Sequence, residues 1–304
     1  ALLLRHDEED AMVVIGRALL LSCVMTLMCA VAKEDAKWRG VRVVVLWRGV
    51  HYGTYSGRAR TTVRVDATTE RVVTNHRKRV LTPLRESGAN VTVVSVTYES
   101  AKREEWLAQS EVTASRVVPW KTAKGKTSSP NDLLIAAYDF VLTQDFDVLV
   151  SLRCDVVLAK SFVDLAKPLR LDRLGFPWKE ANGIMSKRCM FRTSPSRSCE
   201  SKWSKNGERY ADALVVAPRR AVPDLRFAVA EAQHKFGVHW DQHSMFQHLK
   251  KQRGYTPDAN VSLMLRGYWN SNPNTHRNPL FSLARTKKRQ GHRRSLTPTS
   301  PRSE

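Results

Sequence analysis

A guanidinium and a carboxylate follow one apolar run of this chain at a spacing that suits the binding of a diphosphate. Residues 147–152 read Asp-Val-Leu-Val-Ser-Leu, which predicts a buried strand, and Arg153 and Asp155 come directly after it. In open α/β sheets, ligands bind beyond the carboxyl ends of the strands. There, Asp155 could bind a divalent metal ion, Mn²⁺ or Mg²⁺, and Arg153 could bind phosphate oxygens. The alternative is that Asp155 is an ordinary turn residue.

Such a pair of charges would serve the transfer of a group from a nucleoside diphosphate, because the leaving diphosphate accumulates negative charge. Asp145 and Asp147 form a second acidic pattern, the D-x-D spacing with which sugar transferases bind metal. This pattern precedes the strand, where we expect a turn between a helix and a strand. Asp155 is therefore the better metal candidate.

Two histidines and an aspartate lie close together at 239–243. His239 and His243 stand one helical turn apart and could bind zinc, but no glutamate follows the first histidine and no third ligand is evident. In a transferase, Asp241 or His243 could be the base that deprotonates an acceptor hydroxyl. The alternative is that Asp241 caps the N-terminus of a helix.

Spacing excludes two other motifs. Residues 125–127 read Gly-Lys-Thr, but a phosphate-binding loop needs a second glycine five positions before Gly125, where Trp120 stands. No Gly-x-Ser-x-Gly segment occurs, so the nucleophile elbow of α/β hydrolases is excluded.

The elements that must position these side chains alternate between strands and helices. Apolar runs at 41–46 and 91–96 predict buried strands. Between them, apolar residues at helical spacing predict a helix that ends at Gly88 and is distorted by Pro83 in its last turn. His76 falls within the apolar stripe, which indicates a core histidine. A strand, a helix and a strand in this order favour a β-α-β unit.

The remaining elements extend the same pattern. We expect further strands at 115–118, 174–178, 211–217 and 261–266, and helices at 129–143, 223–234 and 240–251. Residues 52–66 and 179–208 are predicted to be loops. The prediction is a single Rossmann-like α/β domain at 41–284, with a mainly parallel sheet flanked by helices, and a basic disordered tail at 285–304.

The composition is strongly basic. Lys and Arg number 50 against 29 Asp and Glu, a net charge of +21 over 304 residues. This charge attracts polyanions of every kind and does not choose among them. Scattered basic residues such as Arg77, Lys78 and Arg79 are expected on a solvated helix face. Zinc-finger, basic-zipper and RNA-binding sheet patterns do not occur, so no nucleic-acid partner is expected.

Residues 1–32 are expected to be a short extension followed, from Met12, by a targeting segment. Met12 begins a short basic region followed by an apolar run to Ala32, with a small-residue cleavage pattern at 30–32. We expect translation to start at Met12 and the segment to be a cleaved signal peptide; a signal anchor in the membrane and a buried core helix are the alternatives. The sequons at Asn90 and Asn260 fit this compartment.

Five cysteines add one expectation about the lumenal part of the chain. Cys189 and Cys199 flank a polar loop and are expected to form a disulfide that closes it. Cys154, at the end of the predicted strand, would then remain a free thiol.

The order of these features resembles a poorly characterised eukaryotic and viral group of glycosyltransferases with a nucleotide-diphospho-sugar transferase (GT-A-like) fold. The similar pieces are Val-Val-Leu-Trp-Arg-Gly at 44–49, Leu-Thr-Pro-Leu at 81–84, the runs 93–98, 147–155, 210–212, 218–220 and 239–243, and Asn-Pro-Leu-Phe at 278–281. The resemblance implies that Arg48 lies near the nucleotide and that Arg153 and Asp155 occupy the D-x-D position. Here Arg153 stands in place of the first aspartate.

We therefore expect a glycosyltransferase that moves a sugar from a nucleotide-sugar donor to a glycan or protein acceptor in the secretory pathway, in the Golgi or ER lumen or outside the cell. Arg48, Arg153 and Asp155 would bind the diphosphate, directly or through a divalent ion, and Asp241 or His243 would face the acceptor. Two other classes stay open: a non-catalytic basic secreted module that binds acidic glycans, and a nucleic-acid-binding protein.

Overall fold

The apolar run after Val41 forms an interior strand of a seven-stranded sheet in the computed structural model. The structure describes residues 36–57, 61–120, 128–181, 210–236, 245–265, 268–270 and 280–289. The sheet has the order β11-β8-β10-β6-β1-β4-β5. Its strands are β1 (Arg42–Gly49), β4 (Asn90–Tyr98), β5 (Ala114–Val118), β6 (Val148–Arg153), β8 (Leu174–Phe176), β10 (Leu214–Pro218) and β11 (Val261–Leu263).

Most neighbouring strands of this sheet are parallel. β1 pairs in parallel with β4 and β6, β4 with β5, and β8 with β11. Strand β10 is antiparallel to both β6 and β8. The expectation of a mainly parallel sheet is confirmed. The reversed β10 has one consequence for the site: its amino end lies at the edge where β1 and β6 end.

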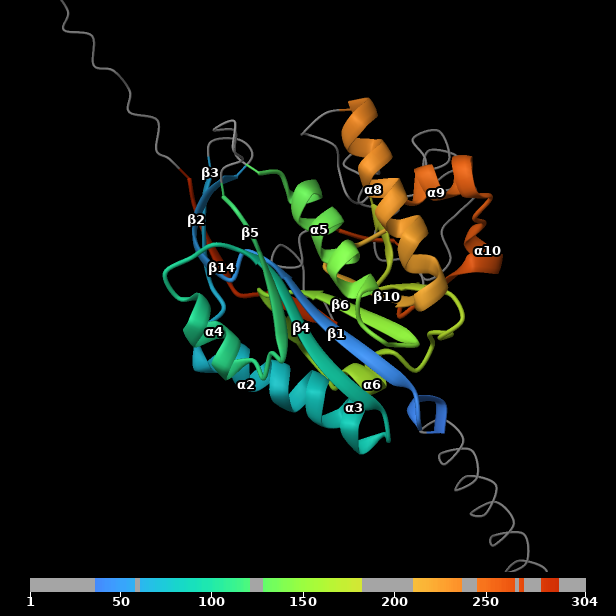
Figure 1. Cartoon of the computed structure of the whole chain (residues 1–304), viewed down its shortest axis with the longest axis horizontal. Coiled ribbons are helices and arrows are strands. Elements are labelled where there is room, and N and C mark those ends of the chain that lie inside the picture. Colours follow the sequence, from blue (N-terminus) through green and yellow to red (C-terminus); the bar gives the residue numbers. More distant parts are fainter. Residues whose placement is uncertain are drawn as a thin grey trace, which may run out of the picture.

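Helices cover both faces of the sheet (Figure 1). One face carries α2 (Glu70–His76), a π-helical segment (Arg77–Leu81), α3 (Thr82–Glu86), α4 (Arg103–Gln109) and α6 (Phe162–Leu165). The other face carries α5 (Pro130–Leu142), α8 (Val222–Phe236) and α9 (Met245–Arg253), with α10 (Pro257–Asn260) after α9. Alternate residues of β1 serve the two layers: Val45 packs in one hydrophobic cluster and Leu46 in the other. The α/β class is therefore confirmed.

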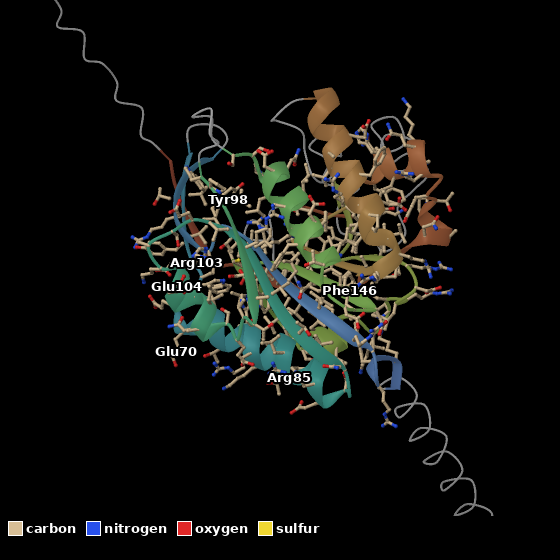
Figure 2. All side chains as sticks on the ribbon, viewed as in Figure 1. Glu70, Arg85, Tyr98, Arg103, Glu104 and Phe146 are labelled. Atoms are coloured by element: carbon tan, nitrogen blue, oxygen red, sulfur yellow. The ribbon has the colours of Figure 1, made fainter. Side chains whose placement is uncertain are left out.

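The helical stretch from Glu70 to Glu86 follows its predicted pattern. The apolar stripe is buried, including His76 at 1% exposure, whereas Arg77, Lys78 and Arg79 are exposed. Figure 2 shows Glu70 and Arg85 on the outer side of α2 and α3. The turn before Pro83 is π-helical. Pro83 has no N–H for the helical ladder, which agrees with the predicted distortion. The stretch ends at Gly88, whose φ of +86° suits glycine.

The prediction of a loop at 52–66 is wrong. Strands β2 (Tyr52–Gly57) and β3 (Thr61–Asp66) pair in antiparallel register, and β14 (Arg285–Arg289) pairs with the other side of β3. Val63 and Val65 are buried beneath this small sheet. The strand pattern is hard to recognise from the sequence, because only Val63 and Val65 form the apolar side of β3 and β2 contains glycines. β14 also shows that strand pairing continues beyond residue 284, into the segment expected to be disordered.

Short elements complete the described part of the chain. They are η1 (Ala36–Trp38), η3 (Arg219–Ala221), β7 (Val156–Leu158) paired with β13 (Phe281–Leu283), and β9 (Lys179–Ala181) paired with β12 (Tyr268–Asn270). Trp38 is fully buried, so the core begins before residue 41. Cys154 is a buried free thiol.

Several predictions fall on residues that the structure does not describe. They are the targeting segment 1–32 with its start at Met12, the Cys189–Cys199 disulfide, the Gly-Lys-Thr segment at 125–127, and the tail beyond residue 289. Within the described ranges, every helix falls short of the length and apolarity that a membrane crossing requires.

Candidate functional site

Two adjacent parallel strands each carry an arginine at the carboxyl end, as the last or second-last residue of the strand. Arg48 of β1 and Arg153 of β6 are register partners. The chain leaves β1 for β4 and β5 on one side of the sheet and returns to β6 on the other side. This change of direction is a topological switch point, and doubly wound sheets bind ligands outside the carboxyl ends of their strands at such points. The sheet thus brings Arg48 and Arg153 together where a ligand is expected.

Arg48 is an almost fully buried cation, with 4% of its surface exposed. Its Nε donates to Ser151 Oγ at 2.9 Å, and its Nη2 donates to the backbone carbonyl of Asp212. Among the residues with described positions, no carboxylate lies within ion-pair distance of this guanidinium. A buried charge is unfavourable unless it is paired. Arg48 is therefore suited to an anionic ligand.

Arg153 and Asp155 form a two-pronged ion pair. Arg153 Nε donates to Asp155 Oδ1 at 3.0 Å, and Nη2 donates to Oδ2 at 2.7 Å. The Asp155 side chain is 3% exposed and the Arg153 side chain 24%. This geometry is the strong form of an arginine–carboxylate contact. Asp155 therefore fixes the direction of the Arg153 guanidinium at the edge of the sheet.

Backbone hydrogen bonds hold the segment that carries this pair. Arg153 N donates to Ala213 O at 3.0 Å, and Cys154 N donates to Arg48 O at 3.0 Å. Ala284 N donates to Asp155 O at 2.7 Å. Segments from β1, from the start of β10 and from the end of the described chain therefore meet at Asp155, which explains why this strand end is buried.

The described side chains do not fit a divalent cation at Asp155. Both carboxylate oxygens of Asp155 accept hydrogen bonds from Arg153, and Arg48 adds a second positive charge nearby. The described ranges contain no group of three His, Cys, Asp or Glu side chains that could hold a metal ion. The expected metal role of Asp155 therefore finds no partner ligands in this part of the chain.

The D-x-D pattern lies at the opposite edge of the sheet. Asp147 accepts from Arg42 at 2.6 Å (Nη2) and 3.2 Å (Nε), and Asp145 also pairs with Arg42. Figure 2 labels Phe146 between them, just before β6, and Tyr98 at the far end of β4. Hydrogen bonds from Arg42 lower the pKa of Asp147 to about 2. The alternative reading, a helix–strand turn, is confirmed.

Helix α5 packs on β1 and β4 and lies over Arg48 on one face of the sheet. It begins with a capping box, in which Ser129 Oγ accepts from Asp132 N and Asp132 accepts from Ser129 N. The helix starts at the carboxyl edge, and the positive end of its dipole lies there. Burial raises the pKa of Tyr138 to about 12, and the proximity of Arg48 opposes that rise. Tyr138 of α5 therefore lies close to Arg48.

A donor in the first turn of α5 lacks a partner within the described part of the structure. The side-chain nitrogen of Asn131 is buried and makes no hydrogen bond there. Asn131 and Tyr138 are seven residues apart and lie on the same helix face. Buried polar groups are usually satisfied by protein, water or ligand.

Asp212 is a site residue that sequence reasoning did not assign. It precedes β10, and its carbonyl accepts from Arg48. Its carboxylate also raises the pKa of Tyr138. The only sequence signal was its place in the run 210–212. The antiparallel direction of β10, which sequence patterns do not reveal, brings Asp212 to the arginines.

The predicted acceptor residues Asp241 and His243 lie outside the described residues, as does His239. The structure therefore tests neither their catalytic role nor the zinc alternative. Of the predicted site residues, Arg48, Arg153 and Asp155 are brought together by the sheet.

No model of a known protein family matches this chain, and no curated protein is significantly similar to it.

Proposed function

We propose that this chain is a glycosyltransferase that binds the diphosphate of a nucleotide-sugar at the carboxyl edge between β1 and β6. One observation carries the proposal: Arg48 and Arg153 are register partners at the topological switch point of a mainly parallel sheet. Strands β5-β4-β1-β6 have the chain order 3-2-1-4, which is also that of doubly wound nucleotide-binding sheets. A GT-A-like fold is the form of this architecture that we propose.

The charges suit the chemistry of sugar transfer. An acceptor hydroxyl oxygen attacks the anomeric carbon, and the bond to the phosphate oxygen breaks with its electron pair on the diphosphate. Fixed guanidinium groups stabilise the negative charge that develops there. Arg48 and Arg153 would supply this stabilisation, and Asp155 would hold Arg153 in place. The base that takes the hydroxyl proton is Asp241 or His243 in this proposal.

Purified protein and a panel of nucleotide-sugars test the proposal. Thermal unfolding is measured with UDP and GDP, and donor hydrolysis is measured with the corresponding sugar nucleotides. We expect one nucleotide to raise the melting temperature, because a ligand that binds only the folded state stabilises it. The increase should be lost in Arg48→Met and kept in Arg170→Met, a control at an exposed arginine. No stabilisation and no hydrolysis with any donor would refute the proposal.

A second candidate, a module that binds acidic glycans without catalysis, is favoured by the small sheet. Strand β14 reads Arg-Thr-Lys-Lys-Arg and pairs with β3, whose Arg64 is exposed. Such a module would bind heparin in a salt-dependent way, since released counterions drive the association. It would not bind nucleotides, and Arg48→Met would not change its affinity for heparin.

A further inference from the structure

We infer that the diphosphate at this site is neutralised by Arg48 and Arg153, and that its binding requires no divalent cation. This inference rests on the proposed function and extends it to the chemistry of the leaving group. Its basis is the set of charged side chains that the sheet brings together at the ends of β1 and β6.

Asp155 already binds Arg153 with both of its carboxylate oxygens. Its side chain is 3% exposed. A cation at Asp155 would have to share the carboxylate with Arg153 at an almost fully buried position, next to the second positive charge of Arg48. The buried pair is therefore more stable intact than divided between an arginine and a metal ion.

A second Arg-x-Asp pair in the chain shows which features of the Arg153–Asp155 pair come from sequence spacing alone. Arg170 and Asp172 have the same spacing and the same two-pronged contact, at 3.1 and 2.9 Å. Their side chains are 58% and 50% exposed, and they precede β8 at the amino edge of the sheet. The Arg-x-Asp spacing is thus sufficient for the two-pronged contact, whether the pair is buried or exposed. Burial and the neighbouring Arg48 distinguish the pair at Asp155.

The positive charge of Arg48 is not compensated by a carboxylate among the described residues. Asp155 compensates the charge of Arg153 instead, and Arg48 is buried. The described charges therefore leave a buried positive site. A diphosphate would pair with Arg48 directly, through strong charge-assisted hydrogen bonds. A divalent cation beside Arg48 would instead add repulsion between like charges.

The decisive experiment needs only the unaltered chain. Isothermal titration calorimetry measures the dissociation constants of UDP and GDP in 1 mM EDTA, in Mn²⁺ and in Mg²⁺. We expect the nucleotide that binds to do so with a constant that differs less than about threefold between EDTA and either metal. A gain of tenfold or more with metal would overturn the inference and leave the proposed function intact. Absence of binding under all three conditions would overturn both.

Variants then separate the role of Asp155 as a metal ligand from its role as a positioning residue. As a positioning residue, Asp155→Asn weakens binding by the same factor, about tenfold, with EDTA and with Mn²⁺. As a metal ligand, it would abolish only the gain produced by Mn²⁺. Arg153→Lys keeps the charge and removes the two-pronged contact, and it should give the same metal-independent loss. Asp172→Asn is the matched control and should bind like the unaltered chain. A loss confined to the Mn²⁺ measurement would overturn the inference.

Discussion

Arg48 and Arg153 face the same side of the central sheet as register partners on adjacent parallel strands. Side chains at paired positions point to the same face of a sheet. That face also holds Ser151, whose hydroxyl accepts from Arg48, and it is covered by α5. Arg48 therefore lies under α5, and Arg153 lies on the neighbouring strand at the same edge, where a nucleotide is expected.

Removal of Arg48 should change ligand binding more than stability. Burial of the Arg48 charge is unfavourable, and this cost offsets the two hydrogen bonds that Arg48 donates to Ser151 and Asp212. We expect Arg48→Met to alter the free energy of unfolding by no more than about 1 kcal/mol, measured by urea denaturation without ligand. A loss of about 3 kcal/mol or more would identify Arg48 as a structural clamp.

The two Arg-x-Asp pairs should differ sharply in their contribution to stability. Asp155→Asn leaves Arg153 partly buried without its carboxylate, and we expect a loss of about 3 kcal/mol in the free energy of unfolding. Asp172→Asn removes an exposed pair and should leave that free energy unchanged within error. Urea denaturation of both variants at pH 7 provides the measurement. Equal effects would contradict the burial that distinguishes the two sites.

Acid should destabilise the chain through its buried histidines. Burial lowers the pKa of His76 to about 4 and that of His51 to about 4, against about 6.5 in an unfolded chain. The folded state thus resists protonation. The stabilisation that depends on these neutral histidines is complete above pH 6.5 and is lost as the pH falls toward 4. For His76 alone, the loss at pH 4 is about 3 kcal/mol.

His76→Phe tests this dependence. His76 stacks on Trp47 with ring centres 4.2 Å apart, which phenylalanine can reproduce, and its Nε2 donates to Val156 O at 2.8 Å, which phenylalanine cannot. The lost hydrogen bond lowers stability equally at every pH, whereas the lost titration reduces the slope. We expect a flatter fall of the free energy of unfolding between pH 6.5 and 4. An unchanged slope would exclude His76 as its source.

The D-x-D pair should have no part in nucleotide binding. Asp145→Asn together with Asp147→Asn should leave the dissociation constant of the nucleotide unchanged, with or without Mn²⁺, because both carboxylates pair with Arg42 at the far edge. The variant should instead lose an acid-sensitive part of its stability. The pKa of Asp147 is held at about 2, so its stabilisation is complete above about pH 4 and is lost as the pH falls toward 2. Weaker nucleotide binding by this variant would contradict the placement of the site.

Local patterns were sufficient for the elements that build the site. The apolar runs correctly predicted β1, β4 and β6, and helical spacing predicted the buried stripe that includes His76. The helix expected at 129–143 is α5, and its capping box at Ser129 is formed by neighbouring residues. Periodicity and capping depend on residues a few positions apart, so they can be read from the chain itself.

The sequence by itself determined that Arg48, Arg153 and Asp155 follow buried strands. Only the tertiary structure decided which groups they meet: the reversed β10 brings Asp212 to Arg48, and Asp155 binds Arg153. Strand order, strand direction and the pairing of β14 with β3 depend on contacts between distant residues, which no local period encodes. The partner of a buried charge likewise depends on the tertiary structure, because burial decides whether the attraction between two charges outweighs the cost of removing them from water.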